Sequence, residues 1–429
     1  MKYAIILILI VVAVLVLILV PYNRGGRSVP MHRWIVNLET NGGPLPFSLS
    51  YWDFRTDPGV WAGSIGGWYS NKLDFEFQKI DEDPHRILIE FPHYDSVLEL
   101  NPDGENRLIG QWIKQRGDSE PAIVPAYATK TFHPTSLFES IENSDDAADF
   151  EGRWRVQFSS SEVEAVGTFV QLSGEGFEVD GVTIALGTFL TTTGDYGSLK
   201  GQIDGNLMRL STFDGAHAFL FHARMQDDGT IEGDFWSGNW HHETWAAVRD
   251  DDAQLPDAFE QTSVTDEAAL EELVFKDIEG TPISVFDALD ATGAPARVLE
   301  IFGTWCPNCA DAGRELVSLK TKYGDKLGIV GLAFEVTEDF ERSATQVRRH
   351  HEHIGSDWAV LIAGLSDKDK ATATLGFLDK VRSYPTLVFL DADNEVQAVY
   401  SGFSGPATGE AYEAQRERFE ATIEDLIGE

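Results

Sequence analysis

The chain has 429 residues and only two cysteines, Cys306 and Cys309. They lie three positions apart, directly after a mainly apolar run at residues 298–303. Such a run predicts a short buried strand, and Pro307 suits the first turn of a helix that follows it. Main-chain amides and the helix dipole stabilise a thiolate at that position. The fold must therefore place a thiol pair where a strand meets a helix, and such a pair can form and open a disulfide.

The cysteine count limits the other uses of this pair. Two cysteines cannot build a structural disulfide framework or a zinc site with four cysteine ligands. A mixed site would have to recruit distant histidines, and His350, His351 and His353 form the only cluster in this half of the chain. Their spacing resembles none of the usual zinc-ligand patterns. The sequence therefore predicts no metal site.

Length and charge narrow the class of protein further. A chain of this length predicts two or three domains. The formal net charge is −37, from 33 basic and 70 acidic side chains. Such a surface keeps a protein soluble and disfavours nucleic acid as a partner.

Residues 4–20 form an unbroken apolar run, which predicts a single transmembrane anchor at residues 1–22. Neither a signal-peptide cleavage site nor a lipid-accepting cysteine follows it. The flanking charges, with Arg24 and Arg27 after the run, favour a cytoplasmic C-terminal side. A tethered dithiol is more useful outside the reducing cytosol, however. We therefore expect the soluble part on the periplasmic side of a bacterial cytoplasmic membrane.

Residues 29–250 have the pattern of an all-β domain, with short alternating strands and frequent turn signals. The block at 91–112 is echoed at 213–236, which predicts two related halves, 29–130 and 150–250, forming a barrel or packed sheets. This domain is rich in tryptophan. These rings either fill its interior or line a ligand site.

The pattern changes after the acidic residues 250–252 and Pro256, which mark a linker. Between 256 and 429, apolar strands alternate with helical segments, and a hairpin at 386–400 precedes a last helix at 409–427. This order predicts an α/β domain with a mixed sheet covered on both faces.

Two motifs in this region resemble the thioredoxin superfamily: Phe-Gly-Thr-Trp-Cys-Pro-Asn-Cys at 302–309 and Ser-Tyr-Pro-Thr at 383–386. Within it, the segments at 331–335 and 402–409 also look like the membrane-anchored TlpA/ResA-type thiol–disulfide oxidoreductases of bacteria. The resemblance covers residues 256–429 and implies a thioredoxin-like fold there.

The resemblance, together with thiol chemistry, assigns roles to these motifs. Cys306 is expected to attack a substrate disulfide, and Cys309, one turn further, to resolve the mixed disulfide. Pro385 matches the family's cis-proline beside the disulfide. The residues expected to surround the pair are Trp305, Pro307, Asn308, Tyr384 and Thr386.

Glu300 lies in the apolar strand six residues before Cys306, where thioredoxin has a buried acid. A carboxylate beneath the cysteines can accept the proton of Cys309. The TlpA/ResA branch often has a glutamate three residues after the second cysteine, and Ala312 stands there in this chain. Glu300 is therefore a candidate for that role, the alternative being a side chain that reaches the edge of the strand.

The sequence thus predicts a membrane-anchored thiol–disulfide oxidoreductase that reduces extracytoplasmic proteins, needs no cofactor beyond the Cys306–Cys309 pair, and draws electrons from a membrane thiol reductase. A disulfide oxidase or isomerase is an alternative, because one fold spans reduction potentials from roughly −270 to −120 mV. A second alternative is a β domain that binds a ligand or client, with a subsidiary redox domain.

Overall fold

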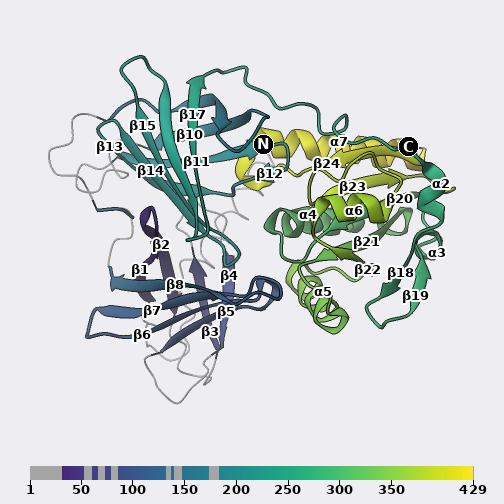
Figure 1. Cartoon of the computed structure of the whole chain (residues 1–429), viewed down its shortest axis with the longest axis horizontal. Helices are drawn as coiled ribbons and strands as arrows, with labels where there is room; N and C mark the ends of the chain where they lie inside the picture. The colour runs from purple at the N-terminus through teal and green to yellow at the C-terminus, as the bar shows by residue number, and fades with distance from the viewer. Residues whose placement is uncertain are drawn as a thin grey trace, which may run out of the picture.

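The computed structural model arranges the chain in three β-sheets, two in the all-β region and one, with helices, towards the C-terminus (Figure 1). Within the described residues, no helix is both long and apolar enough to cross a membrane. The anchor predicted at residues 1–22 lies outside them. The described ranges are 31–52, 60–65, 73–78, 86–131, 137–139, 147–172 and 183–428.

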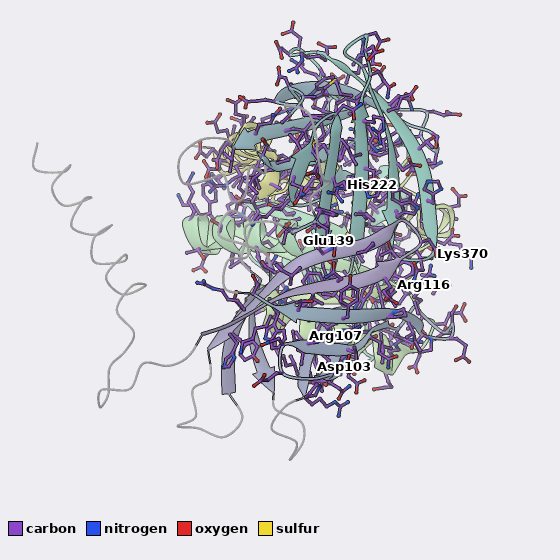
Figure 2. All side chains as sticks on the ribbon, turned by 90° about the vertical axis from the view of Figure 1, so that its left-hand side faces the viewer. Asp103, Arg107, Arg116, Glu139, His222 and Lys370 are labelled. Atoms are coloured by element: carbon purple, nitrogen blue, oxygen red, sulfur yellow. The ribbon has the colours of Figure 1, made fainter. Side chains whose placement is uncertain are left out.

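The first sheet has eight antiparallel strands in the order β4-β3-β2-β1-β8-β7-β6-β5. Alternate residues of β1 (Trp34, Val36 and Leu38) are buried, as expected for a strand with one face on a core. The turn after β6 carries an exposed ion pair, Asp103–Arg107, at 3.2 Å (Figure 2). The elements are β1 (Met31–Thr40), β2 (Gly43–Trp52), β3 (Val60–Ile65), β4 (Leu73–Gln78), β5 (Ile87–Phe91), η1 (Pro92–Tyr94), β6 (Ser96–Pro102), β7 (Arg107–Lys114) and β8 (Ala122–Lys130).

The second sheet closes on itself, because β10 pairs with both β9 and β11. Eight strands form the ring and β12 pairs with β11 beside it, so this part of the chain is a barrel. Phenylalanines and Trp245 fill its interior. The strands are β9 (Gly152–Phe158), β10 (Ala165–Leu172), β11 (Thr183–Thr191), β12 (Gly194–Asp195), β13 (Leu199–Asp204), β14 (Leu207–Phe213), β15 (Ala218–Met225), β16 (Ile231–Ser237) and β17 (His241–Arg249).

The two repeated sequence blocks meet in space. The first block covers the hairpin β6–β7, and the second covers the hairpin β15–β16 in the other sheet. Their equivalent first residues, Phe91 and Phe213, contact each other edge to face with ring centroids 5.7 Å apart. Trp112 of the first block packs on the same Phe213 ring at 5.2 Å. Apolar residues from the second block therefore join the core of the first sheet, beside the barrel's own interior.

The C-terminal sheet has the order β19-β18-β22-β21-β20-β23-β24. The three central strands run parallel, and the others pair antiparallel, so the sheet is mixed as predicted. The elements are α2 (Glu267–Glu271), β18 (Val274–Asp277), β19 (Pro282–Ser284), α3 (Val285–Asp290), β20 (Ala296–Phe302), α4 (Pro307–Tyr323), η2 (Gly324–Lys326), β21 (Leu327–Glu335), α5 (Phe340–Ile354), β22 (Ala359–Leu365), α6 (Lys368–Leu375), β23 (Thr386–Leu390), β24 (Val396–Ser401), η3 (Pro406–Thr408) and α7 (Glu410–Ile427).

Helices cover both faces of this sheet. Side chains alternate along β20, so Val298 joins the core under α4 and α7, whereas Leu299 joins the core under α3 and α6. Within α4, Ala312, Leu316 and Leu319 recur at helical spacing and are fully or almost fully buried. The arrangement is the thioredoxin-like fold that the motifs predict.

The β region docks on the C-terminal sheet through α5. Arg342 donates to Asp95 Oδ2 at 2.9 Å and to the Gly117 carbonyl oxygen at 2.8 Å. The rings of His93 in η1 and His353 in α5 stack with centroids 3.6 Å apart. These contacts hold the open end of the β6–β7 hairpin against α5, which follows β21.

Candidate redox site

Cys306 occupies the N-cap position of α4, after a short loop that follows β20. Its Sγ accepts a hydrogen bond from the Cys309 amide at 3.4 Å, and Pro307 follows in the first turn. A proline there loses no helical hydrogen bond. The structure thus places the thiol where the sequence predicts it, at the positive end of a 17-residue helix.

The segment before β23 lies opposite Cys306. The Cys306 thiol donates to the Tyr384 carbonyl oxygen at 3.4 Å, and the Tyr384–Pro385 peptide bond is cis, as the resemblance implies. Thr386 is fully buried and donates through Oγ1 to the Ser383 carbonyl oxygen at 2.9 Å. Pro385 and its neighbours therefore form one wall of the site around the sulfur.

Trp305 covers the pair from the side of β21. Its Nε1 donates to the Phe334 carbonyl oxygen at 3.0 Å, and its ring meets Tyr384 edge to face, with centroids 5.7 Å apart. Cys306 keeps 7% of its surface exposed, and Cys309 keeps none. Only the first cysteine is thus within reach of a second molecule in this arrangement.

Glu300 lies beneath the pair in the central strand and is 0% exposed. The alternative that its carboxylate reaches the strand edge is therefore wrong. Neither carboxyl oxygen has a hydrogen-bond partner among the described residues. Burial, with a smaller effect from Cys306, raises the pKa of Glu300 to about 8. Burial and then the neighbouring Cys306 also raise the pKa of the Cys309 thiol.

A second buried acid, Glu335, lies at the end of β21. It accepts from the Thr304 amide at 3.0 Å and from Thr304 Oγ1 at 2.8 Å. Burial raises the pKa of Glu335 to about 7, although both Thr304 hydrogen bonds act in the opposite direction. Glu335 thus holds the loop that leads from β20 to Cys306. The family-like segment at 331–335 contains this residue, but its partner could not be inferred from it.

The barrel also contacts the motif directly. Asn308 Nδ2 donates to the Asp195 carbonyl oxygen at 3.2 Å, and Asp195 Oδ2 accepts from the Gly405 amide at 2.6 Å. A Cβ on Gly194 would lie 2.2 Å from Asn308 Nδ2. Asn308, one of the two residues between the cysteines, is therefore covered by β12, a contact that no sequence signal reveals.

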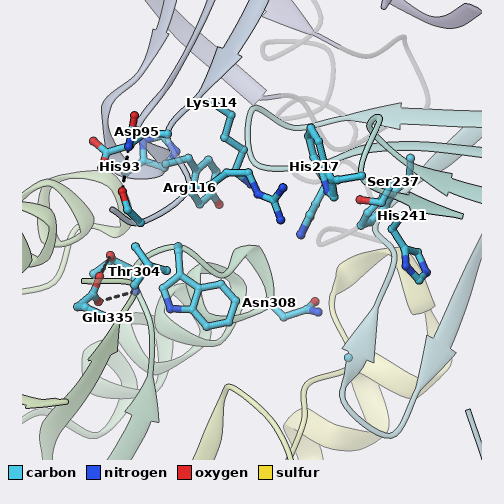
Figure 3. A pocket seen from close by; sticks show the side chains of 18 of the residues that line it. His93, Asp95, Lys114, Arg116, His217, Ser237, His241, Thr304, Asn308 and Glu335 are labelled. Atoms are coloured by element: carbon cyan, nitrogen blue, oxygen red, sulfur yellow. Dashed lines mark hydrogen bonds between the residues drawn. The ribbon is translucent and has the colours of Figure 1, made fainter. Parts of the chain in front are cut away.

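A cavity of about 660 Å³ opens between both β sheets and the redox motif. Thr304, Trp305 and Asn308 line its floor. These residues precede and follow Cys306 in the sequence, so the cavity lies next to the redox motif. Figure 3 shows Arg116, His217 and Asn308 facing this space from three different elements. We call it the chamber. Its size lies within the range of ligand sites, roughly 300–1,000 Å³.

Comparison with known proteins adds likenesses in fold. No family model and no curated protein matches the chain. Solved structures similar to part of it include a thiol:disulfide interchange protein DsbE from Chlorobium tepidum, with 16% identity, a TM-score of 0.27, and coverage of 36% of this chain and 92% of that one. A DsbF homologue from Corynebacterium diphtheriae has 18% identity, a TM-score of 0.27, and coverage of 39% and 98%. A thiol-disulfide oxidoreductase from Bacteroides fragilis has 16% identity, a TM-score of 0.25, and coverage of 34% and 96%.

Proposed function

We propose that this protein exchanges thiols and disulfides through Cys306 and Cys309. The supporting observation is the position of Cys306 Sγ at the N-terminus of α4, 3.4 Å from the Tyr384 carbonyl oxygen, with Cys309 one turn further. The helix stabilises negative charge on the first sulfur, and an extended client segment can lie along the main chain before β23.

In the reducing direction the exchange has two steps. The Cys306 thiolate attacks one client sulfur, a Cys306–client disulfide forms, and the other client sulfur leaves and takes up a proton. Cys309 then loses its proton to Glu300 and attacks Cys306 Sγ, and the first client sulfur leaves as a thiol. Two electrons pass to the client, and the protein holds a Cys306–Cys309 disulfide. A dithiol donor must reduce it again, and the pair itself is the only redox group required.

Glu300 suits this transfer because it is fully buried and its carboxyl oxygens have no hydrogen-bond partner among the described residues. With a pKa of about 8, roughly one Glu300 in ten is ionised at pH 7. The ionised form accepts the Cys309 proton, and the protonated form returns it when the disulfide is opened.

The proposal extends to location and direction. The apolar run at residues 4–20 tethers the protein to a bacterial cytoplasmic membrane, with the dithiol on the periplasmic side. There it reduces disulfides of extracytoplasmic proteins, and a membrane thiol reductase supplies the electrons. A reduction potential near the lower end of the range from roughly −270 to −120 mV supports a reductase, whereas one near the upper end indicates an oxidase or isomerase.

The central test is reduction of a protein disulfide such as insulin by dithiol-reduced protein. We expect turnover with the natural chain and none with Cys306→Ser. Labelling of Cys306 in whole cells with a membrane-impermeant thiol reagent tests the location. Equal insulin reduction by both chains would refute the redox function, and a thiol that only permeant reagents label would refute the location.

A further inference from the structure

The chamber wall contains one arginine, Arg116, that has no acidic partner among the described residues. Arg116, just after β7, has its guanidinium carbon 5.1 Å from the ring centroid of Trp240, and both residues line the chamber. Among the described residues, no carboxylate lies within ion-pair distance of Arg116. Lys114 donates to the Ala216 carbonyl oxygen. Asp214, which interacts with Lys114 electrostatically, already holds His217 Nδ1 at 3.2 Å.

The acids that line the chamber are all engaged with the protein itself. Asp95 pairs with Arg342 at 2.9 Å, and Asp195 accepts from the amides of Gly197 and Gly405, both at 2.6 Å. Glu243 accepts from Ser160 Oγ at 2.6 Å and lies 3.0 Å from His241 Nε2. Glu335 is bound to Thr304. These carboxylates thus have their donors within the protein, whereas the Arg116 guanidinium has no carboxylate partner among the described residues and is left for a ligand.

The charge of this guanidinium is opposite to the net charge of the whole chain, which is −37. A strongly acidic surface repels anions at long range, so an anionic ligand gains only from cations placed where it binds. An arginine is suited to that task, because its planar fork binds a carboxylate with two parallel hydrogen bonds. The neighbouring walls are aromatic, including Phe219, Phe235 and Trp305, and fit the apolar part of a ligand.

We propose that the chamber is the substrate site and selects disulfides that carry a carboxylate near the sulfur, with Arg116 binding that carboxylate. This inference rests on the proposed redox function, because Trp305 and Asn308 bring the chamber next to Cys306. Both hairpins of the sequence repeat contribute residues to the chamber wall. The first hairpin supplies Lys114 and leads to Arg116, and the second begins beside His217 and leads to Trp240.

The test compares three small disulfides of different charge with the reduced full-length protein: the dicarboxylate 3,3′-dithiodipropionate, neutral bis(2-hydroxyethyl) disulfide and cationic cystamine. A second arm uses short peptide disulfides flanked by Glu, Gln or Lys. We expect the rate constant of oxidation to be about tenfold higher for the carboxylate member than for the neutral one. Arg116→Gln should lower the ratio of the carboxylate rate constant to the neutral one from about ten to about one.

Arg107→Gln is the matched control, because Arg107 lies at the other end of β7 in an exposed ion pair (Figure 2). It should keep the preference. A preference for the carboxylate disulfide in both arms shows that a small carboxylate is sufficient for recognition. A preference in the peptide arm alone shows that the carboxylate must belong to a polypeptide. Either result supports the proposal. Equal rates for all charges, or a preference that Arg116→Gln retains, would overturn it.

A binding measurement separates this proposal from the redox function. The thioether 3,3′-thiodipropionate has the same carboxylates and cannot be reduced. We expect calorimetry to detect its binding to the natural chain and about tenfold weaker binding to Arg116→Gln. Binding without reduction of any disulfide would refute the redox function alone, and reduction without binding or charge preference would refute the chamber proposal alone.

Discussion

The two acids near the dithiol are buried alike but differ in their partners. Glu300, in β20 beneath Cys309, has no hydrogen-bond donor among the described residues, and its pKa is raised to about 8. Glu335, on the side that faces the chamber, accepts two hydrogen bonds from Thr304, and its pKa is raised to about 7. Burial acts on both, and the Thr304 hydrogen bonds oppose it only at Glu335. Glu300 is therefore suited to proton transfer, and Glu335 is suited to positioning the loop at Thr304.

The largest expected effect tests which cysteine attacks the client and which one, next to Glu300, resolves the mixed disulfide. Cys309→Ser should abolish turnover and leave Cys306 joined to the client, because no second thiol remains to resolve the mixed disulfide. Mass spectrometry of the trapped complex checks this. If the client were instead found on Cys309 in Cys306→Ser at a similar yield, the difference in exposure between the two cysteines would not govern attack.

The next effect is on stability and has the same sign for both acids. An acid with a raised pKa in the folded state binds more protons folded than unfolded, so stability is greatest below the unfolded pKa and is lost as pH rises through the folded one. For Glu300 the window runs from about 4.5 to about 8 and the loss is at most about 5 kcal/mol. Urea unfolding at pH 5, 7 and 8.5 measures it.

Glu300→Gln should flatten most of this pH dependence, since glutamine does not ionise. Glu335→Gln should flatten less of it, because the Glu335 window ends near pH 7. Identical slopes in the natural chain and in Glu300→Gln would show that Glu300 is not the buried acid described here.

A smaller effect is expected on the rate of resolution. Glu300→Gln should slow the attack of Cys309 about 10- to 100-fold and remove the inflection near pH 8 from its pH profile, because the proton acceptor is lost. Stopped-flow release of the second client thiol measures this step. A variant that keeps the inflection would assign it to another group.

The smallest effect is expected from Glu335→Gln. Glutamine keeps one oxygen that can accept from Thr304, so the loop should stay close to its position, and we expect at most about a threefold loss in the rate constant of client attack. The resolution step should be unchanged. A loss as large as that of Glu300→Gln would remove the distinction between the two acids.

The redox motif was predictable because its parts are local in sequence or carried by a family resemblance. The strand at 298–303, the helix from Pro307 and the hairpin at 386–400 correspond to β20, α4 and β23–β24. The resemblance also placed the cis bond before Pro385. The helix α6 (Lys368–Leu375) was not predicted, since its apolar residues are few and its threonines favour helix weakly.

The chamber could not be predicted in the same way. Its walls come from positions as far apart as His93 and Gln346, and they meet only because η1 docks on α5. No spacing within one strand encodes that Arg116 lies over Trp240 or that Asp195 accepts from Asn308. The repeat identified the two hairpins, but the sequence did not reveal that their ends line one cavity with Trp305 and Asn308.

The contact between Gly194 and Asn308 limits which substitutions each of these two positions can accept. The residues between paired cysteines are a common place to tune a reduction potential, yet here Asn308 is also a docking point for the barrel. A side chain at 194 would occupy the space of the Asn308 amide, and Gly194 has a φ of +147°. The two positions are therefore expected to change together in descendants of this sequence, so that redox tuning and barrel docking are inherited as one trait.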